Sequence, residues 1–134
     1  MESVRSPSIE SLQVAAAAAH LADEKKGQDI RVLAVAPQIK LADYFVIVSG
    51  NSRPHVKALL SEIRSRLKAA GLAPPRVEGT DLGWWVLLDC GDVVVHVMQP
   101  EAREYYDLDG LYGECEEVDW QAVELPELPA ARAG

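Results

Sequence analysis

The segment of residues 84–98, WWVLLDCGDVVVHVM, places the strongest constraint on the fold of this 134-residue chain. Two apolar runs flank a Cys-Gly-Asp stretch, a pattern typical of a β-hairpin with a tight turn. Because successive strand side chains point to opposite faces of a sheet, Trp84 and Trp85 must point in opposite directions. The hairpin therefore presents one tryptophan to each face.

A two-residue turn at Cys90 and Gly91 would give the hairpin two chemically different faces. The core face would be apolar throughout, with Val86, Leu88, Val93, Val95 and Val97, joined by Trp84. The mixed face would combine apolar groups with two acids and an imidazole, namely Trp85, Leu87, Asp89, Asp92, Val94, His96 and Met98. A protein core rarely contains such a mixture, so we expect the mixed face to be available to a partner.

In this register Asp89 lies opposite Asp92, and Trp85 lies opposite His96. Two neighbouring carboxylates repel each other, so we expect water or a cation, such as a lysine of a basic partner, beside them. Trp85 has the large area and single donor of an interface anchor. The alternative, that the chain's own loop or tail covers Trp85, has the same weight as partner binding. A one-residue change in turn length would exchange the two faces of the hairpin.

Hydrophobic periodicity predicts the other elements. A first helix follows a cap at Ser6 and Pro7 and ends before Gly27. The elements expected after it are a strand over 29–35, a strand over 42–50, a helix over 51–71, a strand over 76–78, the hairpin, and a short helix with a turn over 99–112, packed by Tyr105, Leu108, Leu111 and Tyr112.

This order of elements favours an α/β fold with a single mixed β-sheet. The strand-helix-strand passage around residues 44 to 78 would make a parallel pair. Residues 1–113 are expected to form one domain. Residues 114–134, which are acidic and then rich in proline and alanine, are expected to be a flexible C-terminal tail.

Composition narrows the classes of partner. The formal net charge of −8 repels phosphate, so binding of nucleic acid would require a local basic patch, and a basic protein is the more natural partner. No apolar stretch approaches the roughly 20 residues that cross a bilayer, and the first residues lack a signal pattern, so we expect a cytoplasmic protein. The two cysteines lack metal spacing and are expected to be reduced thiols.

Few side chains suggest catalysis. A lone strand histidine such as His96 is more often a hydrogen-bonded structural residue than a ligand or base, so we expect no metal or cofactor. Ser49, Ser52 and His55 could suggest a nucleophile, but they lie where a helix cap is needed. Arg53, beside that cap, is expected to be solvated rather than to hold an anion.

Three segments, in order and at this separation, resemble the ribosomal silencing factor family, also called Iojap-like proteins: LADYFVIVSGNSRPHV, WVLLDCGDVVVHVM and PEAREYYDLDGLYG. The resemblance covers roughly residues 27–113. It implies a nucleotidyltransferase-like α/β fold without the enzyme activity, often dimeric. It further implies binding to the fourteenth protein of the large ribosomal subunit, which hinders joining of the small subunit.

The resemblance also implies roles for single residues. The interface tryptophan of the family corresponds to Trp85, the tryptophan that alternation places on the mixed face. The ExRxxYxL pattern of the family matches Arg103 and Tyr106, which we include among the partner-binding residues. Pro54 replaces a usual polar residue, and Tyr112 replaces a common tryptophan.

These observations favour a non-enzymatic translation repressor that docks on the large subunit and sterically blocks the small one, with a homodimer as a further expectation. A large-subunit assembly factor would use the same face but would accompany immature particles. A nucleotidyltransferase would need clustered carboxylates to hold magnesium. Asp89 and Asp92 form a pair with no evident third acid, so this alternative is weaker.

Overall fold

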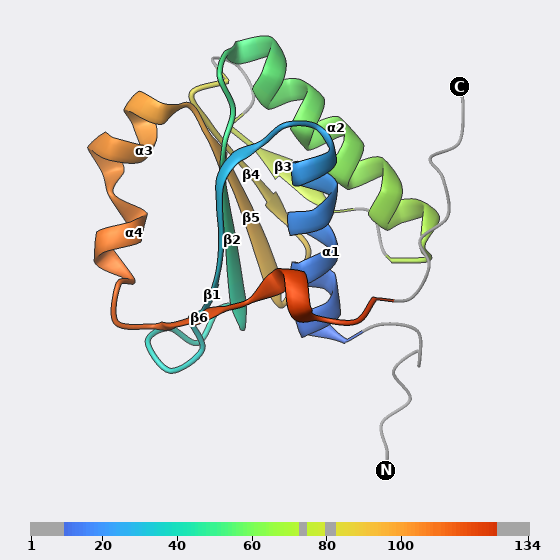
Figure 1. The fold of residues 1–134 in the computed structure, drawn as a ribbon, viewed down its shortest axis with the longest axis vertical. Helices are drawn as coiled ribbons and strands as arrows, with labels where there is room; N and C mark the ends of the chain where they lie inside the picture. Colours follow the sequence, from blue (N-terminus) through green and yellow to red (C-terminus); the bar gives the residue numbers. More distant parts are fainter. Residues whose placement is uncertain (1–9, 73–74, 80–82, 126–134) are drawn as a thin grey trace.

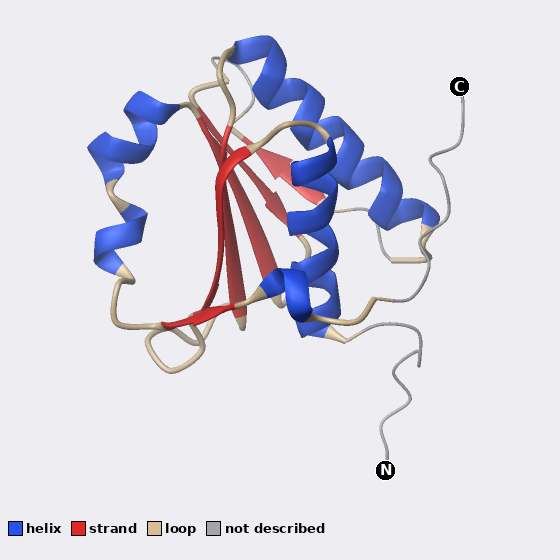
Figure 2. Ribbon diagram, in the orientation of Figure 1, coloured by secondary structure: helices blue, strands red, loops and turns tan. Residues whose placement is uncertain are grey.

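The computed structural model describes residues 10–72, 75–79 and 83–125. Its centre is one six-stranded mixed sheet with the strand order β3-β4-β5-β2-β1-β6 (Figure 1). The strands are β1 (Gln28–Ala34), β2 (Tyr44–Ser49), β3 (Arg76–Glu78), β4 (Trp85–Asp89), β5 (Val93–Met98) and β6 (Glu116–Val118). The helices are α1 (Ser11–Glu24), α2 (Arg53–Ala69), α3 (Pro100–Tyr106), α4 (Leu108–Leu111) and the 3₁₀ turn η1 (Trp120–Ala122). The α/β class and the single mixed sheet are confirmed, and Figure 2 shows the helices on either side of the strands.

One neighbouring pair in the sheet, β2 with β5, is parallel, and the other neighbours are antiparallel. A parallel pair was expected between the strands at residues 44–49 and 76–78, but the parallel partner of β2 is β5, because β3 lies at the edge of the sheet with two strands between it and β2. The hairpin of β4 and β5 inserts between them. As a result the carboxyl ends of β2 and β5 meet at one end of the sheet, where α2 and α3 begin (Figure 1).

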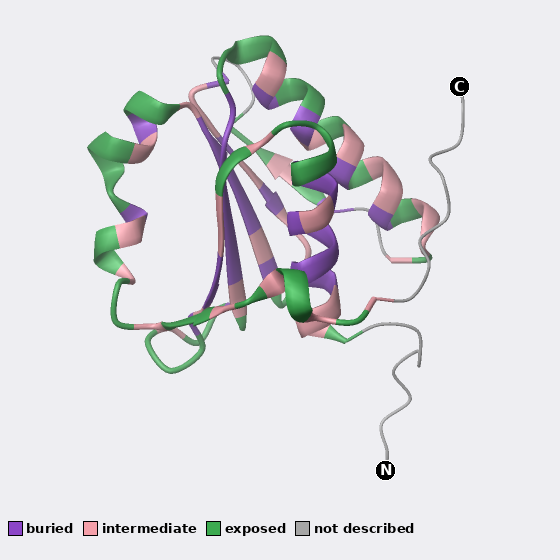
Figure 3. Ribbon diagram, viewed as in Figure 1, coloured by how far each residue is buried: buried purple, intermediate pink, exposed green. Residues whose placement is uncertain are grey.

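The alanine run of α1 lets that helix lie close to its neighbours. Ala15 to Ala19 are all fully buried, so the helix is enclosed on every side over this stretch (Figure 3). Alanine is the best helix former and has no rotamers to lose on burial, which suits a helix held between a sheet and a second helix. The predicted cap at Ser6 and Pro7 lies outside the described residues. The described helix begins after Glu10, whose side chain forms a capping box with Gln13.

Helix α2 has the start that its sequence predicts. The Ser52 side chain accepts a hydrogen bond from the backbone N–H of His55, and Pro54 occupies the first turn. The His55 ring accepts from the Asn51 N–H at 2.8 Å through Nδ1 and donates to the Lys25 carbonyl at 2.8 Å through Nε2. The capping interpretation of Ser52 and His55 is therefore confirmed, and His55 also ties α2 to the end of α1.

The chain does not become a flexible tail directly after Gly113. Strand β6 pairs with β1 in antiparallel register, from Val32 with Val118 to Ala34 with Glu116. Trp120 then packs edge-on against His20 of α1, with 4.9 Å between the ring centroids. The predicted tail is thus wrong for residues 116–122, because an open sheet edge and an apolar helix face are available to them. Residues 126–134 lie outside the described residues.

The short helix with a turn over 99–112 is two helices, separated by Asp107 in the left-handed conformation with φ 50°. Leu108 is buried and Tyr112 is half-buried, as expected. Tyr105 and Leu111, which were expected to pack inward, are 78% and 61% exposed. The break at Asp107 changes the direction of the helix, so one helical face does not collect all four apolar residues. None of the described helices is long and apolar enough to cross a membrane.

Close packing around α1 predicts a penalty for a larger side chain there. Replacement of Ala17 by Leu, at a fully buried site, should lower the free energy of unfolding by about 1–3 kcal/mol, because the sheet and α2 must move. Urea unfolding followed by circular dichroism measures the change. The matched control is Ala58→Leu, at an exposed position of α2, which should stay within about 0.5 kcal/mol of the parent. Equal effects at both sites would contradict the packing described here.

Candidate docking surface on the second sheet face

The hairpin turn lies one residue further along the chain than predicted. The N–H of Cys90 donates to the Val93 carbonyl at 2.9 Å, which makes Gly91 and Asp92 the two loop residues. Gly91 has φ +87°, and glycine at the first loop position is typical of a type II′ hairpin turn. The predicted turn at Cys90 and Gly91 is therefore wrong.

The shifted turn moves every cross-strand pair by two residues. Trp85 lies opposite Met98 and Asp89 opposite Val94, so the predicted pairing of Asp89 with Asp92 is wrong. A shift of two residues keeps the side chains on the same faces, because strand side chains alternate with a period of two. Five predicted core residues are accordingly buried on the side of α1 and α2: Val86, Leu88, Val93, Val95 and Val97.

Trp84 does not join that core. It precedes β4 and packs, half-buried, against the second apolar cluster, which includes Phe45 and Met98. Its carbonyl accepts a hydrogen bond from the N–H of Gln99 at 3.0 Å. The prediction for Trp84 fails because the strand begins at Trp85, and strict alternation does not extend beyond the strand.

Trp85 lies on the mixed face, as predicted, and is half-buried. Its indole Nε1–H donates to Nδ1 of His96 at 3.1 Å. The ring also lies 4.6 Å, centroid to centroid, from the ring of Tyr106, which is 5.0 Å from that of Tyr105. Tyr106 is 44% exposed and Tyr105 is 78% exposed. A continuous aromatic row therefore runs from the sheet to solvent, and the indole is not sealed beneath the chain.

His96 and Met98 lie beneath this row rather than in it, since both are buried. His96 accepts from Trp85 at Nδ1, which assigns the proton of the neutral ring to Nε2, and Nε2 has no hydrogen-bond partner among the described residues. Burial lowers the pKa of His96 to about 4, so the ring is neutral at pH 7. The structure therefore places these two residues as support for Trp85, and not as the direct partner contacts that the sequence suggested.

Leu87 and Val94 are half-buried on the same sheet face. Together with the aromatic row they form what we call the aromatic docking surface, made of Trp85, Leu87, Val94, Tyr105 and Tyr106. Figure 1 shows that α3 and α4 lie on the side of the sheet away from α1 and α2, the side on which this surface lies. The sequence pattern predicted Tyr105 in the interior, and this prediction is wrong. The Tyr-Tyr pair was the available signal, because neighbouring residues on a short helix cannot both face inward.

The two aspartates of the hairpin lie away from Trp85. Asp89 is at the far end of β4, about 13 Å along the strand from Trp85. Its carboxylate accepts a hydrogen bond from the Gly91 N–H at 2.9 Å and lies 3.7 Å from an Arg76 guanidinium nitrogen. Asp92, in the turn, is exposed and approaches the Ser11 hydroxyl at 3.4 Å. Asp89 thus has a cation from its own chain, and no partner is needed to supply one.

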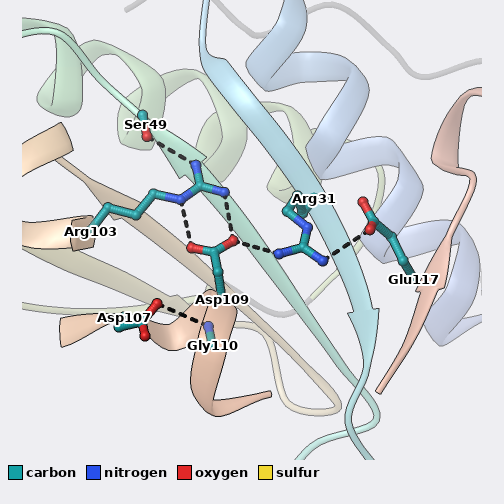
Figure 4. A network of polar contacts seen from close by, with 7 residues as sticks. All are labelled: Arg31, Ser49, Arg103, Asp107, Asp109, Gly110 and Glu117. Carbon is teal, nitrogen blue, oxygen red and sulfur yellow. Dashed lines mark hydrogen bonds and ion pairs between the residues drawn. The ribbon is translucent and has the colours of Figure 1, made fainter. Parts of the chain in front are cut away.

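Arg103 holds the helices of this face against the sheet (Figure 4). Its guanidinium donates to both carboxylate oxygens of Asp109, at 2.9 and 3.0 Å, and to the Ser49 hydroxyl at 2.9 Å. Asp109 also accepts from Arg31 at 2.9 Å, and Arg31 in turn reaches Glu117 of β6 at 3.0 Å. The network therefore joins α3 and α4 to β1, β2 and β6. Arg103 is largely buried in this network, where it positions α3, and its contact with a partner stays a prediction.

Asp109 is the centre of the network. Hydrogen bonds from Arg103, and then from Arg31, hold the pKa of its carboxyl at about 2, against the opposite effect of burial. The neighbouring Asp107 has a local task, because its side chain accepts from the Gly110 N–H at 3.0 Å and so caps α4. The role of Asp109 cannot be predicted from local sequence pattern, since its partners are 6 and 78 residues away.

The described residues contain no cluster of metal-ligating side chains, and the thiol of Cys90 is not activated. Within residues 10–72, 75–79 and 83–125, no three His, Cys, Asp or Glu side chains are placed to hold a metal ion. Cys90 and Cys115 are free thiols, and burial raises the pKa of Cys90 to about 12. A thiol with so high a pKa is protonated at neutral pH and is a poor nucleophile.

Comparison with known proteins identifies the family. The family model described as "Ribosomal silencing factor during starvation" matches residues 8–133. The chain belongs to the ribosomal silencing factor family. This ribosomal silencing factor is 41% identical over 108 residues to the ribosomal silencing factor RsfS of Bacillus subtilis, an alignment that covers 81% of this chain and 89% of the relative.

Two further relatives widen the comparison. A crystal structure of protein CV0518 from Chromobacterium violaceum superimposes with a TM-score of 0.75 at 33% identity, and covers 94% of this chain and 95% of that one. The mouse protein named "Mitochondrial assembly of ribosomal large subunit protein 1" is 37% identical over 92 residues, which is 66% of this chain and 40% of the relative. Relatives of this ribosomal silencing factor thus occur in bacteria and, by name, in a eukaryotic organelle.

The Asp109 network predicts a specific loss of stability. Asp109→Asn should lower the free energy of unfolding at pH 7 by about 1–3 kcal/mol, because two arginines lose their charged acceptor. A depressed folded pKa gives stability that is present above the unfolded value of 3.8 and is lost as pH falls toward 2. The difference from the parent should therefore shrink between about pH 4 and 2. Asp107→Asn, which keeps the acceptor that caps α4, is the control, and an equal loss in both variants would exclude the network as the cause.

His96 predicts a second dependence on pH. Its folded pKa of about 4 lies below the ordinary 6.5, so between these values the unfolded chain binds the proton more readily. Stability should fall as pH drops through this window, with a contribution of up to about 1.4 kcal/mol per pH unit. The variant His96→Leu should lack this contribution in urea titrations at pH 7, 6 and 5. Parallel curves for parent and variant would show that the imidazole is not the group responsible.

Proposed function

We propose that this ribosomal silencing factor docks on its ribosomal partner through the aromatic docking surface and blocks subunit joining by occupying space. As a member of its family, it binds the large ribosomal subunit through the fourteenth large-subunit protein and prevents the small subunit from joining. The activity is not enzymatic. What remains to be assigned is the surface that makes the contact.

One observation carries the assignment, namely the position of Trp85. Its indole is half-buried and oriented from below by His96, while Tyr106 and Tyr105 extend the aromatic row into solvent. Aromatic anchors that are held rigid before binding lose little entropy on association, and they dominate the energy of many interfaces. The resemblance of Trp85 to the interface tryptophan of the family supports the same residue.

The surroundings of this surface suit a basic protein. Glu101, Glu104 and Asp107 are exposed on the α3 segment that carries the two tyrosines. Such a rim of acids around an aromatic centre favours encounter with a positively charged partner and disfavours an acidic one. Arg103 and Asp109 contribute by fixing α3 against the sheet, so that the tyrosines face outward together.

Steric occlusion requires only that the bound domain be large compared with the gap between the subunits. A folded chain of this length has a radius of gyration of about 14 Å. A body of this size on the joining surface of the large subunit excludes the small subunit without any chemical step. We place this activity in the cytoplasm of a bacterium, and we keep the homodimer as a further proposal.

A second candidate function is assistance in assembly of the large subunit. The printed name of the mouse relative states such a role for that protein. An assembly factor with the same docking surface would accompany immature particles rather than mature ones. Pull-down of the tagged protein, followed by analysis of the ribosomal RNA and proteins in the particle, distinguishes the two.

The relation of the fold to nucleotidyltransferases stays a prediction. The parallel strands β2 and β5 end beside the start of α2, the place where many α/β folds bind nucleotides. A bound nucleotide would therefore be sought at this end of the sheet, and calorimetry with magnesium and nucleotide would detect it.

Replacement of Trp85 by Ala tests the docking surface. Loss of an interface anchor costs about 2–4 kcal/mol, so affinity for purified large subunits should fall at least about 30-fold. Co-sedimentation and a subunit-joining assay measure the effect, and circular dichroism shows whether the variant is folded. The matched control is Trp120→Ala, which removes a half-buried tryptophan from the α1 side of the sheet and should bind normally. Normal binding by folded Trp85→Ala protein would refute the assignment.

A further inference from the structure

Helix α2 has a charge opposite to that of the rest of the molecule. It contains five basic residues, Arg53, Lys57, Arg64, Arg66 and Lys68, and one acid, Glu62, in a chain whose net charge is −8. Sequence analysis noted that contact with a polyanion would require such a local patch against the total. The structure decides whether these charges gather on one side.

Four of the five basic side chains lie along one exposed line of the helix. Arg53, Lys57, Arg64 and Lys68 are exposed, and their separations of four, seven and four residues return to the same face of an α-helix. The buried stripe of Val56, Leu59, Ile63 and Leu67, which packs against α1 and the sheet, lies about 110° around the helix from this line, so the line runs along one flank of the exposed side. We call the exposed row the basic stripe. It extends about 22 Å, and the exposed Ser61 lies in its middle.

Three members of this stripe, Lys57, Arg64 and Lys68, form no ion pair with an acid among the described residues. Glu62 is engaged with Arg66 at 3.0 Å, and more weakly with Lys25 at 4.0 Å. Arg64 donates through Nε to the Pro75 carbonyl at 3.2 Å, which orients the guanidinium but leaves its charge in place. The positive potential of the row is therefore available to an outside anion.

The stripe begins beside the docking surface. A Cβ placed on Gly83 would lie 2.7 Å from Cγ of Arg53, so the residue before the two tryptophans packs directly on the first turn of α2. The Gly83 carbonyl also accepts from the Gln99 side chain at 2.7 Å, at the start of α3. The helix then runs away from this end on the opposite side of the sheet (Figure 1). A partner larger than one ribosomal protein can therefore reach both surfaces around this end.

We propose that the basic stripe of α2 binds the phosphate backbone of ribosomal RNA beside the docking protein on the large subunit. A regular row of cations with no large exposed apolar side chain among its members matches a polyanion, whereas protein interfaces have an apolar centre. Contacts with phosphate carry no sequence information, so they orient the factor without reading bases. This inference rests on the proposed docking to the large subunit and adds a second, chemically different contact to it.

The test compares binding to whole large subunits with binding to the isolated fourteenth ribosomal protein, which contains no RNA. The stripe variant is Lys57→Gln/Arg64→Gln/Lys68→Gln. It should bind the isolated protein within about 2-fold of the parent, yet lose roughly 10-fold or more in affinity for large subunits. The slope of log affinity against log salt should fall by about 2, since each neutralised cation contributes about 0.7–0.9. Equal binding to large subunits, or an equal loss on the isolated protein, would overturn the proposal.

Two controls separate the outcomes. Lys57→Glu and Lys40→Glu change the net charge identically, but Lys40 lies in the loop between β1 and β2, so only the first should weaken binding to large subunits. Trp85→Ala should weaken binding to both the subunit and the isolated protein. Normal binding by Trp85→Ala together with loss in the stripe variant would refute the docking surface while leaving the stripe in place. A free RNA duplex measured at low salt shows whether the stripe also binds RNA outside the particle, and loss of that binding in the variant is expected.

Discussion

The half-buried carboxylate of Asp109, held between Arg103 and Arg31, is the interaction on which the second face of the sheet depends. Helices α3 and α4 are short, and helices of this length are marginal in water without tertiary contacts. Charge-assisted hydrogen bonds fix both helices to β1, β2 and β6, while Leu108 and Ala102 contribute a small apolar contact. The orientation of Tyr105 and Tyr106, and with it the shape of the docking surface, follows from this arrangement.

The molecule therefore has two sides of different character around one sheet. The side of α1 and α2 is closely packed, with an alanine helix enclosed between its neighbours and an outer helix that displays cations. The side of α3 and α4 is held by polar contacts and leaves aromatic groups half-exposed. A factor that acts by occupying space requires surfaces that bind strongly and a body that does not deform. The dense core provides the second requirement, and we propose that the partly covered face provides the first.

Much of the fold could be predicted from local pattern. The cap at Ser52, the apolar stripe of α2, and the alternation that separates Val86 and Leu88 from Trp85 and Leu87 all appear in the structure, because each depends on neighbours in the sequence. The wrong predictions concern features that depend on residues far apart in the sequence or on the exact position of a turn. The predicted turn started at Cys90 rather than at Gly91, because both positions fit a tight turn. Strand β6 was not predicted, because its three residues include two acids within an acidic segment.

By itself the sequence determined the class of fold, the faces of the hairpin and the family, since periodicity and motif order are properties of the chain alone. Tertiary structure decided which members of the mixed face reach solvent. His96 and Met98 share the alternation of Trp85, yet they are buried, because Phe45 packs against the His96 ring and Ala102 of α3 lies in the same apolar cluster as Met98, whereas Trp85 is only half-buried. It also decided that Asp109 meets Arg31 and that four cations of α2 form one exposed row. Such facts depend on how elements pack against one another, and packing is set by contacts between residues far apart in the chain.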